Sequence, residues 1–213
     1  MQEIAEIHQK LSPRKKPSQP RSQKMVKRIL DATRNLLRKS GAAEVSQITT
    51  NHIAREANIS VGSLYQYFPN KEAILFELYR EMLEQIAQVL EKFKSGPYLS
   101  LPREEFFDRF NKAMKDAEAE GEVIFEMHNA VKIYPALAEA DRRHAELIAR
   151  EMAGFMKHFG SRWPMEKLQR LALHAYYINY GTWMYRDHAR PDYGEVLDWE
   201  ISALNFIISK CFD

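Results

Sequence analysis

A run of uncharged hydrogen-bonding side chains is the part of this sequence best suited to recognise another molecule. The segment from Val61 to Phe68 reads VGSLYQYF and has no charge, yet it presents hydroxyl, amide and methyl groups at close spacing. Such groups match the donor, acceptor and methyl pattern of base edges in the DNA major groove. Cations flank the segment, and phosphate contacts by cations set register rather than sequence. These cations are Lys24, Lys27, Arg28, Arg55 and Lys71.

The residues of this segment divide by role. Val61, Gly62, Ser63 and Gln66 are expected to meet base edges, because valine suits a thymine methyl group and glycine lets the backbone approach closely. Tyr65 and Tyr67 bring hydroxyls toward phosphates, and Thr50 with its helix N-terminus offers further donors. Aromatic residues so close together are more often core, but their alternate positions between helix caps and cations favour a surface role.

Two short helices joined by a tight turn are expected to position these side chains. The first begins at Thr49 or Thr50, both good N-caps, and ends near Ala57. Ser60 caps the second helix, and Asn58 occupies the turn because asparagine tolerates the left-handed conformation. Small Ala54 allows close approach, and the shared apolar contacts are Ile53, Ala57, Ile59 and Leu64. This layout is that of a helix-turn-helix, whose second helix enters the major groove.

The rest of the chain shows helical periodicity without any alternating strand pattern, so the predicted fold class is all-α. A helix from Ser22 to about Gly41 precedes the helix-turn-helix. The later helices are expected at residues 71–94, 102–120, 122–133, 136–159, 165–187 and 192–211. The first 21 residues are rich in proline and basic residues, which predicts a mobile basic arm.

The charge is distributed unevenly along the chain. The formal net charge of the 213 residues is only +2. Residues 1–80 hold 14 lysines and arginines against 7 acidic residues, whereas residues 81–213 hold 17 against 22. The net charges are therefore +7 and −5, which indicates a polyanion-binding part joined to a part with another task.

Residues 22–71 resemble the TetR family of bacterial transcriptional regulators. The matching segments are ILDATRNLLRKSG, ITTNHIAREANIS and VGSLYQYFPNKEAIL, of which LYQYFPNKE is the most specific. Asn58 stands where the family commonly has glycine. The resemblance implies that Thr50, Tyr65, Tyr67 and Lys71 contact phosphates, and that Asn51 joins Val61, Gly62, Ser63 and Gln66 in reading bases.

The resemblance also implies an architecture and a mode of action. A three-helix DNA-binding domain at residues 22–70 would follow the arm at 1–21, and a six-helix regulatory and dimerisation domain would occupy 71–213. Members bind palindromic double-stranded operators as homodimers and usually repress. A small ligand moves the fourth helix and releases the DNA.

A ligand pocket for a small apolar or amphipathic effector is expected in the second part of the chain, because pockets are apolar with a few polar groups. Its expected lining is Tyr79, Met82, Ile86, Phe106, Phe110, Met114, Phe125, His128, Phe155, His174 and Tyr177. Each of these residue types is also common in an ordinary core, and both histidines suit core positions.

The last two helices are apolar on almost every side, and a helix of that kind is buried on more than one face. Pairing with their copies in a twofold four-helix interface would cover the second face. The interface is expected to contain Leu171, Ala175, Ile178, Leu197, Ile201, Leu204 and Ile208. The alternative is a deeply buried helix in a monomer.

Other function classes are disfavoured. The sequence has no GxSxG, Walker, GxGxxG or HExxH motif, and its seven histidines are dispersed, so we expect no enzyme, cofactor or metal site. No apolar run approaches the ~20 residues that span a bilayer, and no signal peptide is evident, so a cytoplasmic location is expected. The alternative function is an orphan dimeric DNA-binding or architectural protein without a small-molecule ligand.

Overall fold

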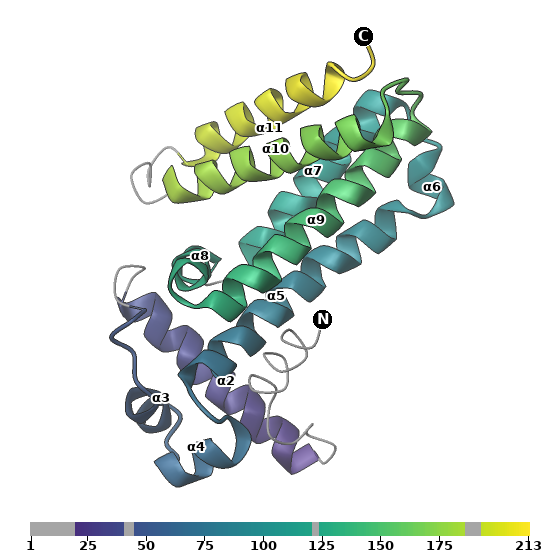
Figure 1. The fold of residues 1–213 in the computed structure, drawn as a ribbon. Coiled ribbons are helices and arrows are strands. Elements are labelled where there is room, and N and C mark those ends of the chain that lie inside the picture. The colour runs from purple at the N-terminus through teal and green to yellow at the C-terminus, as the bar shows by residue number, and fades with distance from the viewer. Residues whose placement is uncertain (1–19, 41–44, 121–123, 186–192) are drawn as a thin grey trace. The chain divides into compact units, whose positions relative to one another are not determined.

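The computed structural model describes residues 20–40, 45–120, 124–185 and 193–213. Within these ranges the chain forms ten α-helices and no β-strand, which confirms the all-α prediction (Figure 1). Grouped by internal contacts, the chain divides into two compact units, Met1–Glu84 with Gly121–Ala140 and Gln85–Glu120 with Asp141–Asp213. The predicted functional boundaries at residues 21 and 70 do not coincide with this division and stay predictions.

Three helices form the N-terminal part of the first unit: α2 (Pro20–Ser40), α3 (Thr50–Glu56) and α4 (Val61–Tyr67). Helix α2 packs against α3, and α3 packs against α4. Pro20 begins α2 because proline lacks only an N–H that a first turn leaves unpaired, so α2 includes two residues of the predicted arm. Residues 1–19 of that arm lie outside the described residues. The largest fully buried side chains of this part are Ile29, Leu30, Leu37, Ile53, Leu64 and Phe68.

Helix α5 (Lys71–Phe93) follows at once, because the Asn70 side chain caps it by accepting the Ala73 N–H at 2.8 Å. Its residues up to Glu84 belong to the first unit, together with α8 (Ile124–Ile133) and the start of α9 (Pro135–His158). The expected break at Tyr134-Pro135 is a single residue between two helices. Pro135 tolerates the first position of α9 for the same reason as Pro20.

The second unit contains the remainder of α5 and α9 with α6 (Gly96–Leu99), α7 (Arg103–Glu120), α10 (Met165–Tyr185) and α11 (Tyr193–Ser209). Helix α11 packs against both α10 and α7. The one-turn helix α6 lies where the sequence predicts only a break. The predicted span 165–187 begins with α10 and its last two residues lie outside the described residues, whereas the predicted span 192–211 ends two residues beyond α11.

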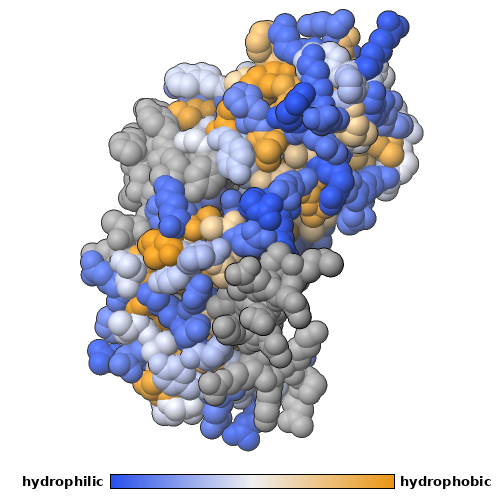
Figure 2. Space-filling model, viewed as in Figure 1, coloured by the Kyte–Doolittle hydropathy of each residue, from blue (hydrophilic) through white to orange (hydrophobic). Residues whose placement is uncertain are grey.

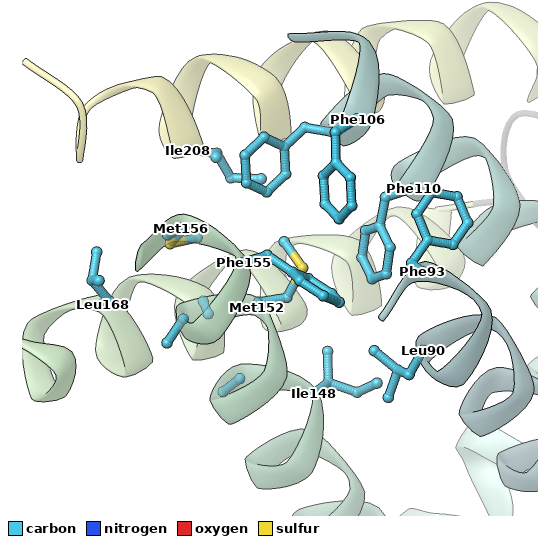
Figure 3. Close-up of a cluster of buried hydrophobic side chains, with 14 of the residues drawn as sticks. Leu90, Phe93, Phe106, Phe110, Ile148, Met152, Phe155, Met156, Leu168 and Ile208 are labelled. Atoms are coloured by element: carbon cyan, nitrogen blue, oxygen red, sulfur yellow. The ribbon is translucent and has the colours of Figure 1, made fainter. Parts of the chain in front are cut away.

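Aromatic rings fill the core of the second unit (Figure 3). Phe106 lies 5.0 Å from Phe155 and 5.5 Å from Phe93, measured between ring centroids, and Phe110 lies 5.5 Å from Phe155. All three pairs meet edge to face, which suits the charge distribution of aromatic rings. Ile208 of α11 joins the same cluster, so the C-terminal helix is attached to the core through its apolar face.

The face of the molecule seen in Figure 2 is mainly hydrophilic where side chains are described, with small hydrophobic patches among them. Among the described residues, no helix is long and apolar enough to cross a membrane.

Candidate nucleic-acid interface

The turn between α3 and α4 is built as the sequence predicts. Thr49 caps α3 by accepting the His52 N–H at 3.2 Å, which decides between the two candidate caps. Asn58 has a φ of 51°, in the left-handed region. The Ile59 N–H reaches the Ala54 carbonyl at 2.9 Å and the Asn58 N–H reaches the Arg55 carbonyl at 3.0 Å. This pair of hydrogen bonds is a Schellman motif, which ends α3 and directs the chain into α4.

An additional contact, which the sequence does not reveal, holds this turn from outside. The Arg28 guanidinium of α2 donates to the Asn58 carbonyl at 3.2 Å. Arg28 therefore links the first helix to the residue whose conformation sets the angle between α3 and α4. Sequence reasoning assigned this arginine only to the positive charge around the interface.

Helix α4 has a buried face and an exposed face. Leu64 and the adjoining Phe68 are fully buried, so they attach the helix to the rest of the unit. Ser60 caps the helix by accepting the Ser63 N–H at 3.0 Å, and the two serine hydroxyls are 2.8 Å apart. The remaining positions face outward or lie at the edge, and among them Gly62 and Gln66 are exposed.

The structure places the predicted base-reading residues on adjacent helices of one unit. Asn51 is exposed on the first turn of α3, and Val61 and Ser63 are half-buried on α4. A methyl group added at Gly62 would meet Ser60 Oγ at 3.9 Å, an ordinary contact. The described fold therefore has room for a side chain at position 62 and does not itself require glycine there.

Two of the predicted phosphate contacts lie together. Thr50 of α3 and Tyr65 of α4 bring their hydroxyl oxygens to 3.1 Å of each other. Tyr65 is 39% exposed, so this hydroxyl pair is open to a partner. Tyr67 is half-buried on the same helix. One hydroxyl donates its hydrogen to the other, and the second hydroxyl can still donate its own hydrogen to an anion.

Lys71 has a different environment from the other predicted phosphate contacts. Its ammonium donates to the Val45 carbonyl at 3.2 Å and to the Ser46 carbonyl at 3.0 Å. The ammonium also lies over the Tyr134 ring, 5.5 Å from its centroid. Sequence reasoning missed these partners, because Val45 and Tyr134 are far from residue 71 in the chain.

Positive charge gathers on α2 beside α3. An open groove of about 350 Å³ between these helices is lined by Lys24, Lys27, Arg28, Asp31, Ala32, Asn35, Glu56 and Ala57. Three cations of α2 therefore line the groove. Its two acidic residues are each paired with another cation, Asp31 with Arg34 and Glu56 with Lys39. Among the described residues, no ion pair engages Lys24 or Lys27. Their charge is therefore available to an anionic partner.

The predicted effector-pocket residues are distributed over both units. Ile86, Phe106, Phe110 and Phe155 are buried in the aromatic core of the second unit, and Met114 packs against it. Tyr79, Met82 and His128 are buried in the first unit. His174 is exposed and Tyr177 is 49% exposed, while the side chain of Phe125 lies outside the described residues.

A buried polar cluster of the second unit escaped sequence reasoning. His144 of α9 is buried, and its ring lies 6.2 Å from that of Tyr176 in α10. The Tyr176 hydroxyl donates to the buried Asp141 carboxylate at 3.2 Å. Burial lowers the pKa of His144 to about 4, because a charged imidazolium would lose its hydration there. His144 is therefore neutral at physiological pH.

The predicted dimer residues fall into two groups. Ala175, Leu204 and Ile208 are buried within their own unit, whereas Leu171, Ile178, Leu197 and Ile201 are half-buried. Large side chains that the prediction omitted are more exposed: Trp199 is 60% exposed and Phe206 is 63% exposed. These two residues are seven positions apart and so lie on one face of α11.

Fold and site together define a helix-turn-helix protein of the all-helical class. Residues 29–78 match the family model described as bacterial regulatory proteins, tetR family. Among the curated proteins none matches the chain. No group of three or more metal-ligating side chains occurs among the described residues.

Three solved structures have a fold similar to that of this chain. A TetR-family transcriptional regulator from Syntrophomonas wolfei is 15% identical, with a TM-score of 0.68 over 88% of this chain and 96% of its own. Another from Streptomyces coelicolor is 21% identical, with a TM-score of 0.55 over 89% and 98%. A TetR regulator from a Rhodococcus species is 17% identical, with a TM-score of 0.50 over 87% and 96%. Residues 29–78 thus match the TetR family, and the chain has the fold of TetR-family transcriptional regulators.

Proposed function

We propose that this protein is a transcriptional repressor that binds a palindromic DNA operator as a homodimer and is released by a small-molecule effector. The observation that carries the proposal is the exposed face of α4. It consists of uncharged residues and is held in place by the buried Leu64 and Phe68, and the adjoining α3 packs against α2, where no ion pair among the described residues engages Lys24 or Lys27. A DNA-reading helix needs this combination, because bases are read by shape and hydrogen bonds while the surroundings supply charge.

In this proposal the outward residues of α4 and the first turn of α3 meet base edges. Gln66 and Asn51 offer amide groups that suit adenine, and Val61 offers methyl groups to thymine. The Thr50–Tyr65 hydroxyl pair and Tyr67 bind phosphates on either side, and Lys24 and Lys27 add charge that steers the approach. Ser63 contributes through a hydroxyl that Ser60 already orients.

Gly62 allows a sharp test of this surface. Because the described fold has room for a methyl group there, Gly62→Ala is expected to raise the free energy of unfolding by up to about 1 kcal/mol. The melting temperature should rise slightly as a result. On DNA the same methyl group would separate the backbone of α4 from the bases, so operator affinity falls at least tenfold. The operator itself would come from selection among random duplexes.

Gly154 is the matched control for this experiment. It is an exposed glycine of α9, and a methyl group added there meets no described atom within 4 Å. Gly154→Ala should therefore stabilise the protein to a similar extent and leave DNA affinity unchanged. Equal affinities of the two variants and the unmodified protein would refute the proposed reading surface.

The homodimer is proposed from the outward face of α11 together with α10. Trp199 and Phe206 expose large apolar areas on the outward face of α11, whereas the half-buried Leu197 and Ile201 lie beside its buried face. Exposed patches of this kind mark association surfaces. Trp199→Glu with Phe206→Glu is expected to yield monomers in sedimentation, whereas Ile133→Glu, at an exposed apolar position of the first unit, should leave the dimer intact. Monomers in the unmodified protein would refute this part of the proposal.

The effector is proposed to act through α5, which begins directly after the helix-turn-helix and continues into the second unit. An effector can shift the balance between DNA-bound and released conformations only by binding them with different affinity. A screen for thermal stabilisation, followed by operator release, would identify such a compound. The effector-free alternative predicts that no compound does both.

A further inference from the structure

Lys71 stands at a position where a helix disfavours a cation. It is the first residue of α5, and the N-terminal end of a helix has a partial positive charge. Its ammonium nevertheless has a defined place, because the Val45 and Ser46 carbonyls accept hydrogen bonds at 3.2 and 3.0 Å. Two of the three donors of the ammonium are thereby engaged within the protein.

These two carbonyls lie at the entrance to the helix-turn-helix. Val45 is fully buried, and the chain runs from it through the buried Ile48 to Thr49, the cap of α3. Lys71 lies at the exit, directly after the α4 segment and its Asn70 cap. Its two hydrogen bonds therefore join the beginning and the end of the segment that contains both DNA-facing helices, across 25 and 26 residues.

Tyr134 covers the same ammonium from another part of the first unit. Its ring centroid lies 5.5 Å from Lys71 Nζ, a distance at which a cation is attracted to an aromatic face. The backbone of Tyr134 is held at both sides. Its N–H donates to the Ala130 carbonyl of α8 at 2.9 Å, and its carbonyl accepts the Leu137 N–H of α9 at 3.0 Å.

We propose that Lys71 is a positioning residue, which closes the helix-turn-helix through the Val45 and Ser46 carbonyls under the Tyr134 ring. This assignment rests on the proposed DNA-binding function and adds to the phosphate contact that the family resemblance implies for Lys71. When the closure is lost, α3 and α4 spend less time in the binding arrangement, and the apparent affinity falls by that fraction.

The salt dependence of operator binding separates the two roles. Each phosphate contact contributes about 0.9 to the slope of log K against log salt. We expect Lys71→Met to weaken operator binding more than tenfold and to lower the slope by about 0.9, since it removes two charge-assisted hydrogen bonds together with the phosphate contact. A loss of affinity that disappears at high salt would leave only the phosphate contact and would overturn the proposal.

Tyr134→Leu supplies a second variant that keeps the Lys71 charge. We expect it to weaken binding about threefold with the salt slope of the unmodified protein, because the charge stays while the ring that covers the ammonium is gone. Tyr134→Phe keeps the ring and should bind as the unmodified protein does. In the Lys71→Met, Tyr134→Leu double variant the two losses should not multiply, since both remove one arrangement. If the loss of operator affinity in the double variant equalled the product of the two single losses, the proposal would be overturned.

The pair of Lys92 and Tyr98 provides matched controls. Lys92 belongs to the same helix α5, and its ammonium lies over the Tyr98 ring at the same distance of 5.5 Å. Both residues belong to the second unit. Lys92→Met removes an equal charge and Tyr98→Leu an equal ring, and neither should change operator affinity. Losses equal to those at Lys71 and Tyr134 would overturn the assignment.

Hydrogen exchange tests the closure without DNA, so its failure is distinguishable from failure of the proposed function. We expect the amides of residues 45–56 to exchange several-fold faster in Lys71→Met than in the unmodified protein, and at the unmodified rate in Lys92→Met. Unchanged exchange in Lys71→Met would overturn the positioning role even if the protein binds an operator. Faster exchange would support that role even if no duplex were bound.

Discussion

The ion pair between Lys115 and Glu200 is expected to respond very differently to the loss of one partner and to the loss of both. Lys115 Nζ lies 2.5 Å from Glu200 Oε1, and the two side chains are only 5% and 2% exposed. The Asn179 amide oxygen accepts a further hydrogen bond from the same ammonium. The three residues belong to α7, α11 and α10, so the cluster connects the three helices.

Lys115→Met leaves the Glu200 carboxylate buried without its counter-ion, which costs about 3–5 kcal/mol of stability. In the double variant Lys115→Met with Glu200→Leu no charge is buried, and apolar residues of similar size often replace such a pair at little cost. We therefore expect the double variant to regain most of the loss. The measurement is urea unfolding followed by circular dichroism at one protein concentration, because a dimer's apparent stability depends on concentration.

The pair of Arg109 and Glu105 on the same helix α7 is the control. Its side chains are 58% and 42% exposed, so Arg109→Met should cost at most about 1 kcal/mol. If Lys115→Met cost no more than Arg109→Met, the reasoning from burial would be refuted. A double variant as unstable as the single one would show that the charge pair is not what Lys115 contributes.

Three other perturbations have defined outcomes. Because burial lowers the His144 pKa to about 4 from 6.5, the unfolded chain binds more protons between these values, so stability should fall by up to about 3 kcal/mol as the pH drops from 6.5 to 4. His144→Phe should flatten this part of a pH series of urea unfolding curves. Asn58→Gly should keep or raise the free energy of unfolding, since φ is positive at this position. Asn58→Val should lower it by about 1–2 kcal/mol for the same reason. Phe106→Ala should cost about 3–5 kcal/mol in the same assay, because the ring is fully buried among other rings.

The helix-turn-helix could be predicted in detail because its determinants are local. The Thr49 and Ser60 caps, the Asn70 cap and the left-handed Asn58 each depend on residues within about one helical turn. Sequence spacing also separates Leu64 and Phe68 from the outward positions of α4, since a short helix has one buried stripe. Local chemistry therefore predicts both the shape and the exposed face of the candidate site.

The contacts that hold this site in place could not be predicted in the same way. Tyr134 lies over Lys71, and Arg28 reaches the Asn58 carbonyl, across long stretches of sequence that leave no periodic signal. The effector pocket stays a prediction, because composition does not distinguish the lining of a pocket from an ordinary core or an exposed position. Residues such as Phe106 and His174 have the composition of a pocket lining, but one is buried among other rings and the other is exposed.

Helix α11 shows why apolar composition alone does not tell which face of a helix points inward. Trp199, Ile201, Leu204, Phe206 and Ile208 are all apolar, so several rotations about the helix axis would bury similar area. Glu200 removes this freedom, because a carboxylate can be buried only where it meets Lys115.

With Glu200 facing inward, Leu204 and Ile208 must follow it at intervals of four residues, as observed. Trp199 and Phe206 are then directed away from the core, where we propose that the partner binds. The double variant Lys115→Met with Glu200→Leu separates the two effects, since it restores stability without restoring the rotational preference. We therefore expect that variant to fold but to dimerise more weakly in sedimentation. Unimpaired dimerisation would show that apolar packing alone sets the rotation of α11.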